Sequence, residues 1–307
     1  MERERIRKVP HKWAIPAQLT DYQSACKQFS WQQIQAELNG LPDGRGLNIA
    51  HEAVDRHASG PAAESIAMRW LNKDEVCSDF SYAELSRQSS RFANLLQQLS
   101  INKGERVFAL CGRIPSLYIA ALGCWKQLAV FCPLFSAFGP EPIQQRLSRG
   151  DAKLLITTEK LYRKKVAPLR TRLPQLKYVL LVDSDEDLTD GALSLSKALS
   201  MVSDEFQIPA TDPEDMAILH FTSGTTGLPK GAVHVHEALL HHYASGRFVL
   251  DLRPGDIYWC TADPGWVTGT SYGIIAPLLH GVTNIIDEAE FDSERWYRIL
   301  SEQGVNV

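Results

Sequence analysis

Residues 216–231 read MAILHFTSGTTGLPKG, an apolar run followed by a loop of glycines, hydroxyl residues and one lysine. The apolar run predicts a buried strand. In the loop, glycines let backbone N–H groups approach anionic oxygens closely, hydroxyls add neutral donors, and the lysine adds a point charge. The pattern therefore predicts a polyphosphate site. Its candidate ligands are Thr222, Ser223, Gly224, Thr225, Thr226, Gly227 and Lys230.

The P-loop, Gly-x-x-x-x-Gly-Lys-Ser/Thr, is the first comparison to make, and this sequence does not match it. Gly224 and Gly227 stand three positions apart, Pro229 precedes the lysine, and Gly231 occupies the place of the hydroxyl residue that binds magnesium. Pro229 also disfavours a helix that starts directly under the phosphates. A surface turn rich in glycine, serine and threonine is the alternative interpretation.

Positions 222–231 instead resemble the Thr-Ser-Gly-Thr-Thr-Gly-x-Pro-Lys-Gly loop of the adenylate-forming enzymes, and they match it at every specified residue. That superfamily includes acyl-CoA synthetases, peptide-synthetase adenylation domains and luciferases. The resemblance implies that the loop holds the β- and γ-phosphates of ATP and steadies the departing pyrophosphate, while Mg²⁺ offsets phosphate charge. Such a role is positioning and charge stabilisation, without covalent catalysis.

A second stretch, CTADPGWVTG at residues 260–269, narrows the resemblance to acetyl-CoA synthetases and their short-chain relatives. The Gly-Trp-Val-Thr-Gly segment makes luciferases and peptide synthetases poorer matches. Carried over, Trp266, Val267 and Thr268 line the acyl pocket, and Thr268 also meets CoA. The side-chain chemistry is consistent with these roles, because the flat indole of Trp266 can form the end wall of a short cavity and the hydroxyl of Thr268 can donate to a carboxylate. Without the resemblance, Trp266 reads as a core aromatic.

Residues 131–141 resemble the segment where this family holds CoA. The usual Phe-Gly-Gly-Phe run is replaced by residues 135–138, Phe-Ser-Ala-Phe, so both glycines that permit close backbone approach are missing. Arg163 occupies the place of a family arginine that contacts the CoA phosphates, and the second such arginine falls on Val166, a departure that Lys164 or Lys165 could cover. An exposed helix surface is the alternative for these cations. The predicted CoA-binding residues are Phe135, Ser136, Ala137, Arg163, Lys164 and Thr268.

Around these motifs, candidate strands and helices alternate. The expected strands are 106–112, 129–134, 154–157, 178–182 and 257–262, and the expected helices are 31–38, 116–127, 140–149, 161–173 and one from about 237. Ser81 and Glu84 form a capping-box pattern before another amphipathic helix. Strands that are apolar throughout are typical of parallel sheets with helical crossovers. The sequence thus predicts an α/β fold, mainly parallel sheets flanked by helices. The resemblance makes it the amino-terminal part of the large adenylate-forming domain.

Composition excludes several classes of protein. The net charge of −4 gives no reason to expect nucleic acid or an anionic membrane as partner. The six cysteines show no zinc spacing, and the charged first ten residues lack the apolar core of a signal peptide. We therefore expect a cytoplasmic protein without disulfides. The acidic residues of 183–190 lack the Gly and Glu of an EF-hand, and His236 and Glu237 miss the zincin spacing, so no metal site is predicted.

We expect residues 1–45 to form an amino-terminal cap segment and residues 46–307 an incomplete ligase domain. The resemblance covers only the amino-terminal half of such a synthetase. The family's catalytic lysine would lie beyond Val307, so no catalytic residue is assigned, and residues 304–307 read as the start of a strand. The implied reaction joins acetate to CoA with ATP, via an acetyl-adenylate. Alternatives are a propionyl- or medium-chain acyl-CoA synthetase and an inactive remnant that binds nucleotide or CoA. The sequence does not indicate an oligomeric state.

Overall fold

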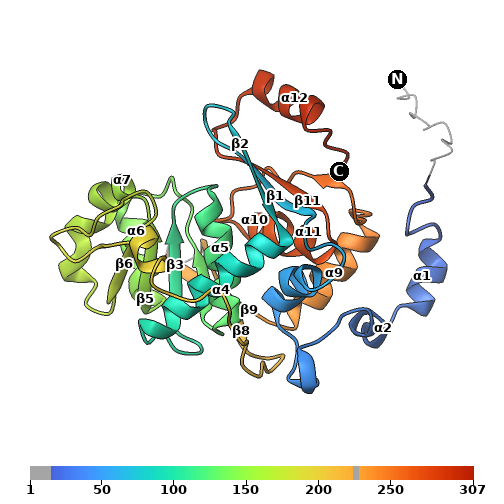
Figure 1. Cartoon of the computed structure of the whole chain (residues 1–307), viewed down its shortest axis with the longest axis horizontal. Coiled ribbons are helices and arrows are strands. Elements are labelled where there is room, and N and C mark those ends of the chain that lie inside the picture. The colour runs from blue at the N-terminus through green and yellow to red at the C-terminus, as the bar shows by residue number, and fades with distance from the viewer. Residues whose placement is uncertain (1–14, 224–227) are drawn as a thin grey trace.

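Seven strands form the larger of two sheets in the computed structural model, which describes residues 15–223 and 228–307 (Figure 1). Its strand order is β7-β6-β5-β3-β4-β8-β9, and every neighbouring pair is parallel except β8 and β9. The second sheet has the order β10-β11-β1-β2. The strands are β1 Ile66–Leu71, β2 Cys77–Ser81, β3 Arg106–Leu110, β4 Val130–Pro133, β5 Ala152–Thr157, β6 Tyr178–Leu181, β7 Leu193–Ser194, β8 Met216–Ser223, β9 Pro229–Val235, β10 Ile257–Tyr258 and β11 Thr283–Asp287.

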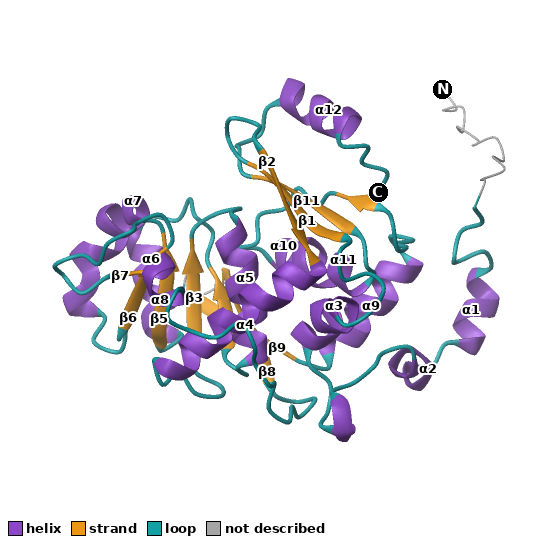
Figure 2. Ribbon diagram, in the orientation of Figure 1, coloured by secondary structure: helices purple, strands orange, loops and turns teal. Residues whose placement is uncertain are grey.

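Helices cover both faces of the larger sheet (Figure 2). They are α1 Tyr22–Gln28, α2 Trp31–Ala36, α3 Arg56–Ala58, α4 Tyr82–Gln98, α5 Pro115–Lys126, α6 Pro140–Arg149, α7 Glu159–Leu161, α8 Leu195–Leu199, α9 Ala238–Phe248, α10 Val267–Thr270, α11 Ala276–Leu279 and α12 Ser293–Glu302. Wider π-helical turns span 51–55, 162–166 and 271–275. None of the helices in the described residues is both long and apolar enough to cross a membrane.

Burial on both faces explains why the central strands are apolar throughout. Along β3, Val107 and Ala109 belong to one hydrophobic cluster, whereas Phe108 and Leu110 belong to a second cluster on the opposite face. The helices α4 and α5 contribute to the first cluster, and α6 with the 162–173 segment contributes to the second. The predicted parallel α/β sheet is therefore confirmed.

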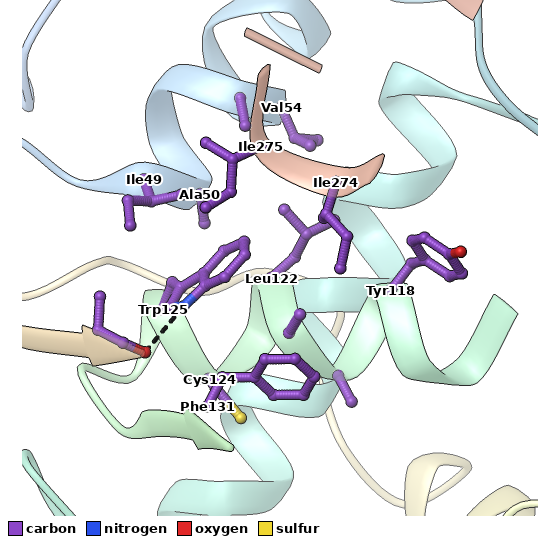
Figure 3. Close-up of a cluster of buried hydrophobic side chains, with 14 of the residues drawn as sticks. Ile49, Ala50, Val54, Tyr118, Leu122, Cys124, Trp125, Phe131, Ile274 and Ile275 are labelled. Carbon is purple, nitrogen blue, oxygen red and sulfur yellow. Dashed lines mark hydrogen bonds between the residues drawn. The ribbon is translucent and has the colours of Figure 1, made fainter. Parts of the chain in front are cut away.

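Chain segments far apart in sequence meet in the first cluster (Figure 3). Trp125 of α5 is fully buried and donates its indole N–H to the carbonyl of Ala217 in β8, at 3.0 Å. Ile49 and Ile274 approach from before β1 and from the 271–275 turn. Through this hydrogen bond and its packing, Trp125 connects α5 to β8, the strand that leads into the predicted phosphate loop.

The predicted helix starts are largely confirmed. The hydroxyl of Ser81 accepts the backbone N–H of Glu84 at 3.1 Å and caps α4, although the Glu84 side chain bonds Gln88 and Arg87 and does not reach back to the cap. Helix α9 begins at Ala238, close to the predicted start. The expected helix at 161–173 is a series of short helical turns, interrupted near Pro168.

Three predictions of local structure are wrong in detail. The expected loop at 222–231 has strand at both ends of its described part, because β8 continues to Ser223 and the antiparallel β9 starts at Pro229. The expected strand at 257–262 ends at Tyr258. Asn306 then donates to the carbonyl of Ile257 and Val307 accepts from Trp259, so the expected strand at 304–307 runs beside β10 without being assigned as regular strand.

The segment before residue 45 lies against α9. Helix α1 buries no side chain and α2 buries only Ile34. The amide of Gln18 donates to the carbonyls of Arg247 and Leu252, and Glu37 pairs with Arg247 at 2.5 Å. Nothing in these contacts decides where a domain boundary lies, so the division at residue 45 stays a prediction.

Candidate functional site

The predicted site lies at the carboxyl ends of two adjacent parallel strands. Phe131 of β4 is in register with Ile218 of β8. Phe135, just after β4, and Thr222, near the end of β8, therefore lie at the same edge of the sheet, since each is four residues further along the chain. In open α/β sheets this edge is where ligands bind.

The hairpin places two predicted phosphate ligands side by side. Thr222 and Lys230 are cross-strand partners, and both side chains are exposed. Cross-strand partners share one face of the sheet, so the hydroxyl and the ammonium can serve one anion. Ser223 is the last residue of β8 and pairs with Pro229. The other predicted ligands, Gly224, Thr225, Thr226 and Gly227, lie outside the described residues.

Residues 135–138 form a tight turn that needs no glycine. The N–H of Phe138 donates to the carbonyl of Phe135 at 3.1 Å, and neither Ser136 nor Ala137 has a positive φ. The conformational freedom of the family's two glycines is therefore not required for this turn. Lys165 closes the turn from the side, donating to the carbonyls of Ser136 at 2.6 Å and Phe138 at 2.8 Å.

The segment predicted to line the acyl pocket packs directly on this turn. A Cβ on Gly265 would lie 2.4 Å from the backbone nitrogen of Phe135, and one on Gly269 would lie 2.1 Å from the carbonyl of Asp263. Only glycine permits such contacts. The carboxylate of Asp263 also accepts the N–H of Gly265 at 2.7 Å. The two predicted segments, more than a hundred positions apart, are thus in contact.

Trp266 is not a core residue, since 51% of it is exposed. Its ring centre lies 5.7 Å from that of Phe135 and 6.4 Å from that of Phe138. The Arg146 guanidinium lies over the Phe138 ring, 4.3 Å from its centre, and donates to the carbonyl of Pro142 at 3.0 Å. Val267 and Thr268 follow at the start of α10 and are also exposed. The predicted acyl-pocket and CoA-loop residues therefore share one aromatic surface.

A cleft of about 340 Å³ opens beside this surface and contains residues that the sequence did not indicate. Arg113, just after β3, donates to the carbonyls of Asp287 at 2.7 Å and Ala289 at 2.5 Å. Its guanidinium also lies 3.8 Å from Asp263, whose carboxyl pKa is raised by burial despite this charge. Trp259 and Trp296 complete the wall. In the sequence, only the position of Arg113 just after a predicted buried strand could have indicated that it belongs to the site.

The three basic residues of 163–165 have different roles. Arg163 is an exposed side chain paired with Glu159 at 2.7 Å, and Lys164 is exposed without an ion pair in the described residues. Lys165 is turned inward onto the loop, and Val166 is buried. Phosphate contacts from Arg163 and Lys164 stay a prediction. The structure adds Lys165 to the site.

Two of the four histidines in residues 234–242, His236 and His242, are buried, and His220 of β8 is buried as well. Burial lowers the pKa of His220 and His236 to about 4, and His236 accepts the backbone N–H of Ile49 at 3.1 Å. Within residues 15–223 and 228–307, no three histidine, cysteine or acidic side chains converge to hold a metal ion. His236 therefore acts in packing.

Comparison with known proteins identifies the family to which this chain is similar. The family model described as AMP-binding enzyme matches residues 54–307. The acetyl-coenzyme A synthetase of Bacillus subtilis is 38% identical over 96% of this chain and 52% of its own length, and that of Methanothrix thermoacetophila is 34% identical over 86% and 43%. The crystal structure of a Brucella canis acyl-CoA synthetase superimposes with a TM-score of 0.85 and 33% identity, covering 93% of this chain and 51% of that one. The chain spans about half the length of the relatives it matches.

Proposed function

Because this chain belongs to the AMP-binding enzyme family, we propose that it is the amino-terminal part of an AMP-forming acyl-CoA ligase whose carboxylate substrate is acetate. The observation that carries the proposal is the meeting of three loops at one sheet edge. The hairpin bearing Thr222 and Lys230, the turn at Phe135 and the segment at Gly265 lie around the same rim. Relatives named acetyl-coenzyme A synthetase support the choice of acetate.

In the proposed first step, a carboxylate oxygen of acetate attacks the α-phosphorus of ATP, and the bond to the departing pyrophosphate breaks. Thr222 and Lys230 would bind the β- and γ-phosphate oxygens and stabilise the charge that accumulates there. The methyl group would face Trp266, Val267 and Thr268. In the second step, the CoA thiol loses its proton, attacks the acyl carbon and releases AMP.

Mg²⁺ belongs to this chemistry as the counter-ion of ATP. The described residues supply no three-ligand cluster for it, so we assign it no protein ligands in this chain. CoA is the proposed thiol substrate, with Phe135, Ser136, Ala137, Arg163, Lys164 and Thr268 as its contacts. We also propose the boundary at residue 45, a cytoplasmic location, and small-molecule substrates as partners, with neither nucleic acid nor membrane among them. Cell fractionation and co-purification would test the location and the partners.

Acetate-dependent exchange of pyrophosphate into ATP, measured on the full polypeptide that carries this sequence, tests the first step. Lys230→Ala should slow the exchange by about 100-fold, the usual effect of removing one charge-stabilising donor. Lys160→Ala is the matched control, because Lys160 is exposed on α7, away from the hairpin. Unchanged exchange in Lys230→Ala would refute the phosphate assignment.

Two alternatives have distinct outcomes in the same assay. Faster exchange with propionate or a medium-chain acid than with acetate would replace the substrate but keep the reaction. ATP binding without exchange in the full polypeptide, for any short carboxylate, would instead indicate a binding remnant without turnover.

A further inference from the structure

Lys165 is the basic residue whose contacts best explain the shape of the turn at 135–139. It lies in the π-helical turn Tyr162–Val166, and both end residues of that turn are completely buried. Its ammonium is therefore carried by an anchored segment. From there it donates to the carbonyls of Ser136 and Phe138 at 2.6 and 2.8 Å. Partial burial, with the nearby charge of Lys164, lowers the pKa of this ammonium.

These two bonds fix the direction of two peptide groups. The chain has no cis peptide among the described residues, and in a trans peptide the carbonyl and the following N–H point in opposite directions. Holding the carbonyls of Ser136 and Phe138 toward Lys165 turns the N–H groups of Ala137 and Gly139 away from it. Both residues are exposed, and neither N–H donates to any acceptor in the described part of the chain.

We propose that Lys165 is a positioning residue that holds the turn so that the N–H groups of Ala137 and Gly139 face the thiol substrate and donate to the amide oxygens of its pantetheine arm. This inference rests on the proposed function, and it names the contacts of the CoA site. The Trp266 ring beside the turn supplies the apolar surface for the methylene groups of the same arm. The turn keeps its shape although serine and alanine replace the family's glycines.

Calorimetric titration of the full polypeptide that carries this sequence with CoA, and separately with pantetheine, tests the role of Lys165. Lys165→Met should weaken the binding of both ligands by about 10-fold, because two charge-assisted hydrogen bonds to the turn are lost. Lys165→Arg, which keeps the donors, should restore most of the affinity, and Lys160→Met should bind like the wild type. ATP affinity should be the same in all four proteins, which a general loss of structure would not permit.

A second pair of variants tests the N–H donors directly. Gly139 has φ −71° and ψ 172°, values that proline also adopts, so Gly139→Pro removes the N–H with little change of backbone. Gly139→Ala keeps the N–H, and its Cβ comes no closer than 4.0 Å to Pro142. We expect Gly139→Pro to weaken pantetheine binding by about 3- to 10-fold and Gly139→Ala to leave it unchanged.

The outcomes separate the two proposals. A wild-type chain that binds ATP but neither CoA nor pantetheine would overturn the thiol assignment and this inference with it. Normal CoA binding by Lys165→Met, or equal binding by the two Gly139 variants, would overturn the inference alone. Loss of CoA affinity with unchanged pantetheine affinity would also overturn it, because the effect would then lie on the phosphates.

Discussion

The two sheets of this molecule are held together by different interactions. The seven-stranded sheet has apolar side chains on both faces, and its central strands β3 to β6 are buried in two hydrophobic clusters. The four-stranded sheet joins the first of these clusters on one face, through Met68 and Ile286. Its other residues form only a small cluster around Leu71, Ile285 and Ile299, beside which buried or half-buried arginines make polar contacts. Arg295 pairs with the carboxylate of Asp287, and Arg113 donates to the carbonyls of Asp287, the last residue of β11, and Ala289.

This difference between the two sheets predicts which single substitutions should lower the stability of the fold most. Apolar burial is spread over many side chains, so no one of them dominates the larger sheet. A buried ion pair concentrates its effect, because removing one partner leaves the other charge unpaired and desolvated. The stability of the smaller sheet should therefore depend on a few charged residues. The contact between the loops that follow the two sheets should depend on its glycines.

The largest effect is expected at Arg295. Its side chain is 7% exposed and that of Asp287 is 4% exposed, and the two lie 2.6 Å apart. Arg295 also donates to the carbonyls of Asn72 and Lys73, which ties α12 to the end of β1. Arg295→Met should lower the free energy of unfolding by about 3–5 kcal/mol, as measured by urea denaturation.

Two further variants check the cause. Arg69→Met removes a half-exposed pair with Asp79 in the same sheet and should cost about 1 kcal/mol or less. Replacing both buried partners, Arg295→Met with Asp287→Leu, should be less destabilising than Arg295→Met alone. A loss from Arg295→Met no larger than that from Arg69→Met would show that the sheets do not differ in this way.

A smaller effect is expected at Gly265, where a loop of the chain after β10 touches the turn after β4. The Cβ of Gly265→Ala would lie 2.4 Å from the nitrogen and 2.6 Å from the Cα of Phe135, so backbone must move. We expect a loss of about 1–3 kcal/mol in unfolding free energy, typical of overpacking, together with weaker CoA binding.

Gly60→Ala is the control for this variant. Its Cβ would come only within 3.5 Å of the Arg56 carbonyl, an ordinary contact, and neither of the atoms nearest to it belongs to the turn. Wild-type stability and CoA affinity in Gly265→Ala would mean that the two loops separate without cost, and their meeting could then not define a site.

The sequence predicted the larger sheet better than the smaller one for a physical reason. Apolar runs such as those of β3 and β5 are recognisable without knowledge of their neighbours, because burial on both faces requires them. Strand β1 contains Arg69 and pairs with β11, whose partner residues lie more than two hundred positions later. No local sequence pattern predicts the pairing of β1 with β11. The apolar part of β8 was predicted as a strand, but the ten-residue motif that follows it was expected to be loop, so the end of β8 and the start of β9 were missed.

The same limit applies to the candidate site. The motifs at 222–231 and 260–269 could be read directly, and the structure brings the second into contact with the turn at 135. The roles of Lys165 and Arg113 depend on how the chain returns to the turn and to β11, so spacing alone could not assign them. The family resemblance predicted that Arg163 contacts the CoA phosphates, whereas in the structure its exposed side chain forms an ion pair with Glu159.

An effect that is absent at neutral pH and appears only in acid is expected at a polar exception within the apolar region, His242 of α9. Burial lowers the pKa of its ring to about 3, with smaller contributions from His234 and His241. The folded chain therefore keeps the ring neutral, whereas the unfolded chain takes up a proton below about pH 6.5. Stability is complete above that pH and falls with acid, by up to about 1.4 kcal/mol per pH unit for this one group. His242→Leu should show a shallower decline of unfolding free energy between pH 6 and pH 4.

His241→Leu is the matched control, since His241 is the preceding residue of the same helix and is exposed. This variant should keep the wild-type slope. Equal slopes in all three proteins would mean that the His242 ring is protonated in the folded chain, and so reaches water or a carboxylate. In that event the helices packed around α9 would not exclude solvent, and the contrast between an apolar region and an ion-paired one would have to be redrawn with α9 on the polar side.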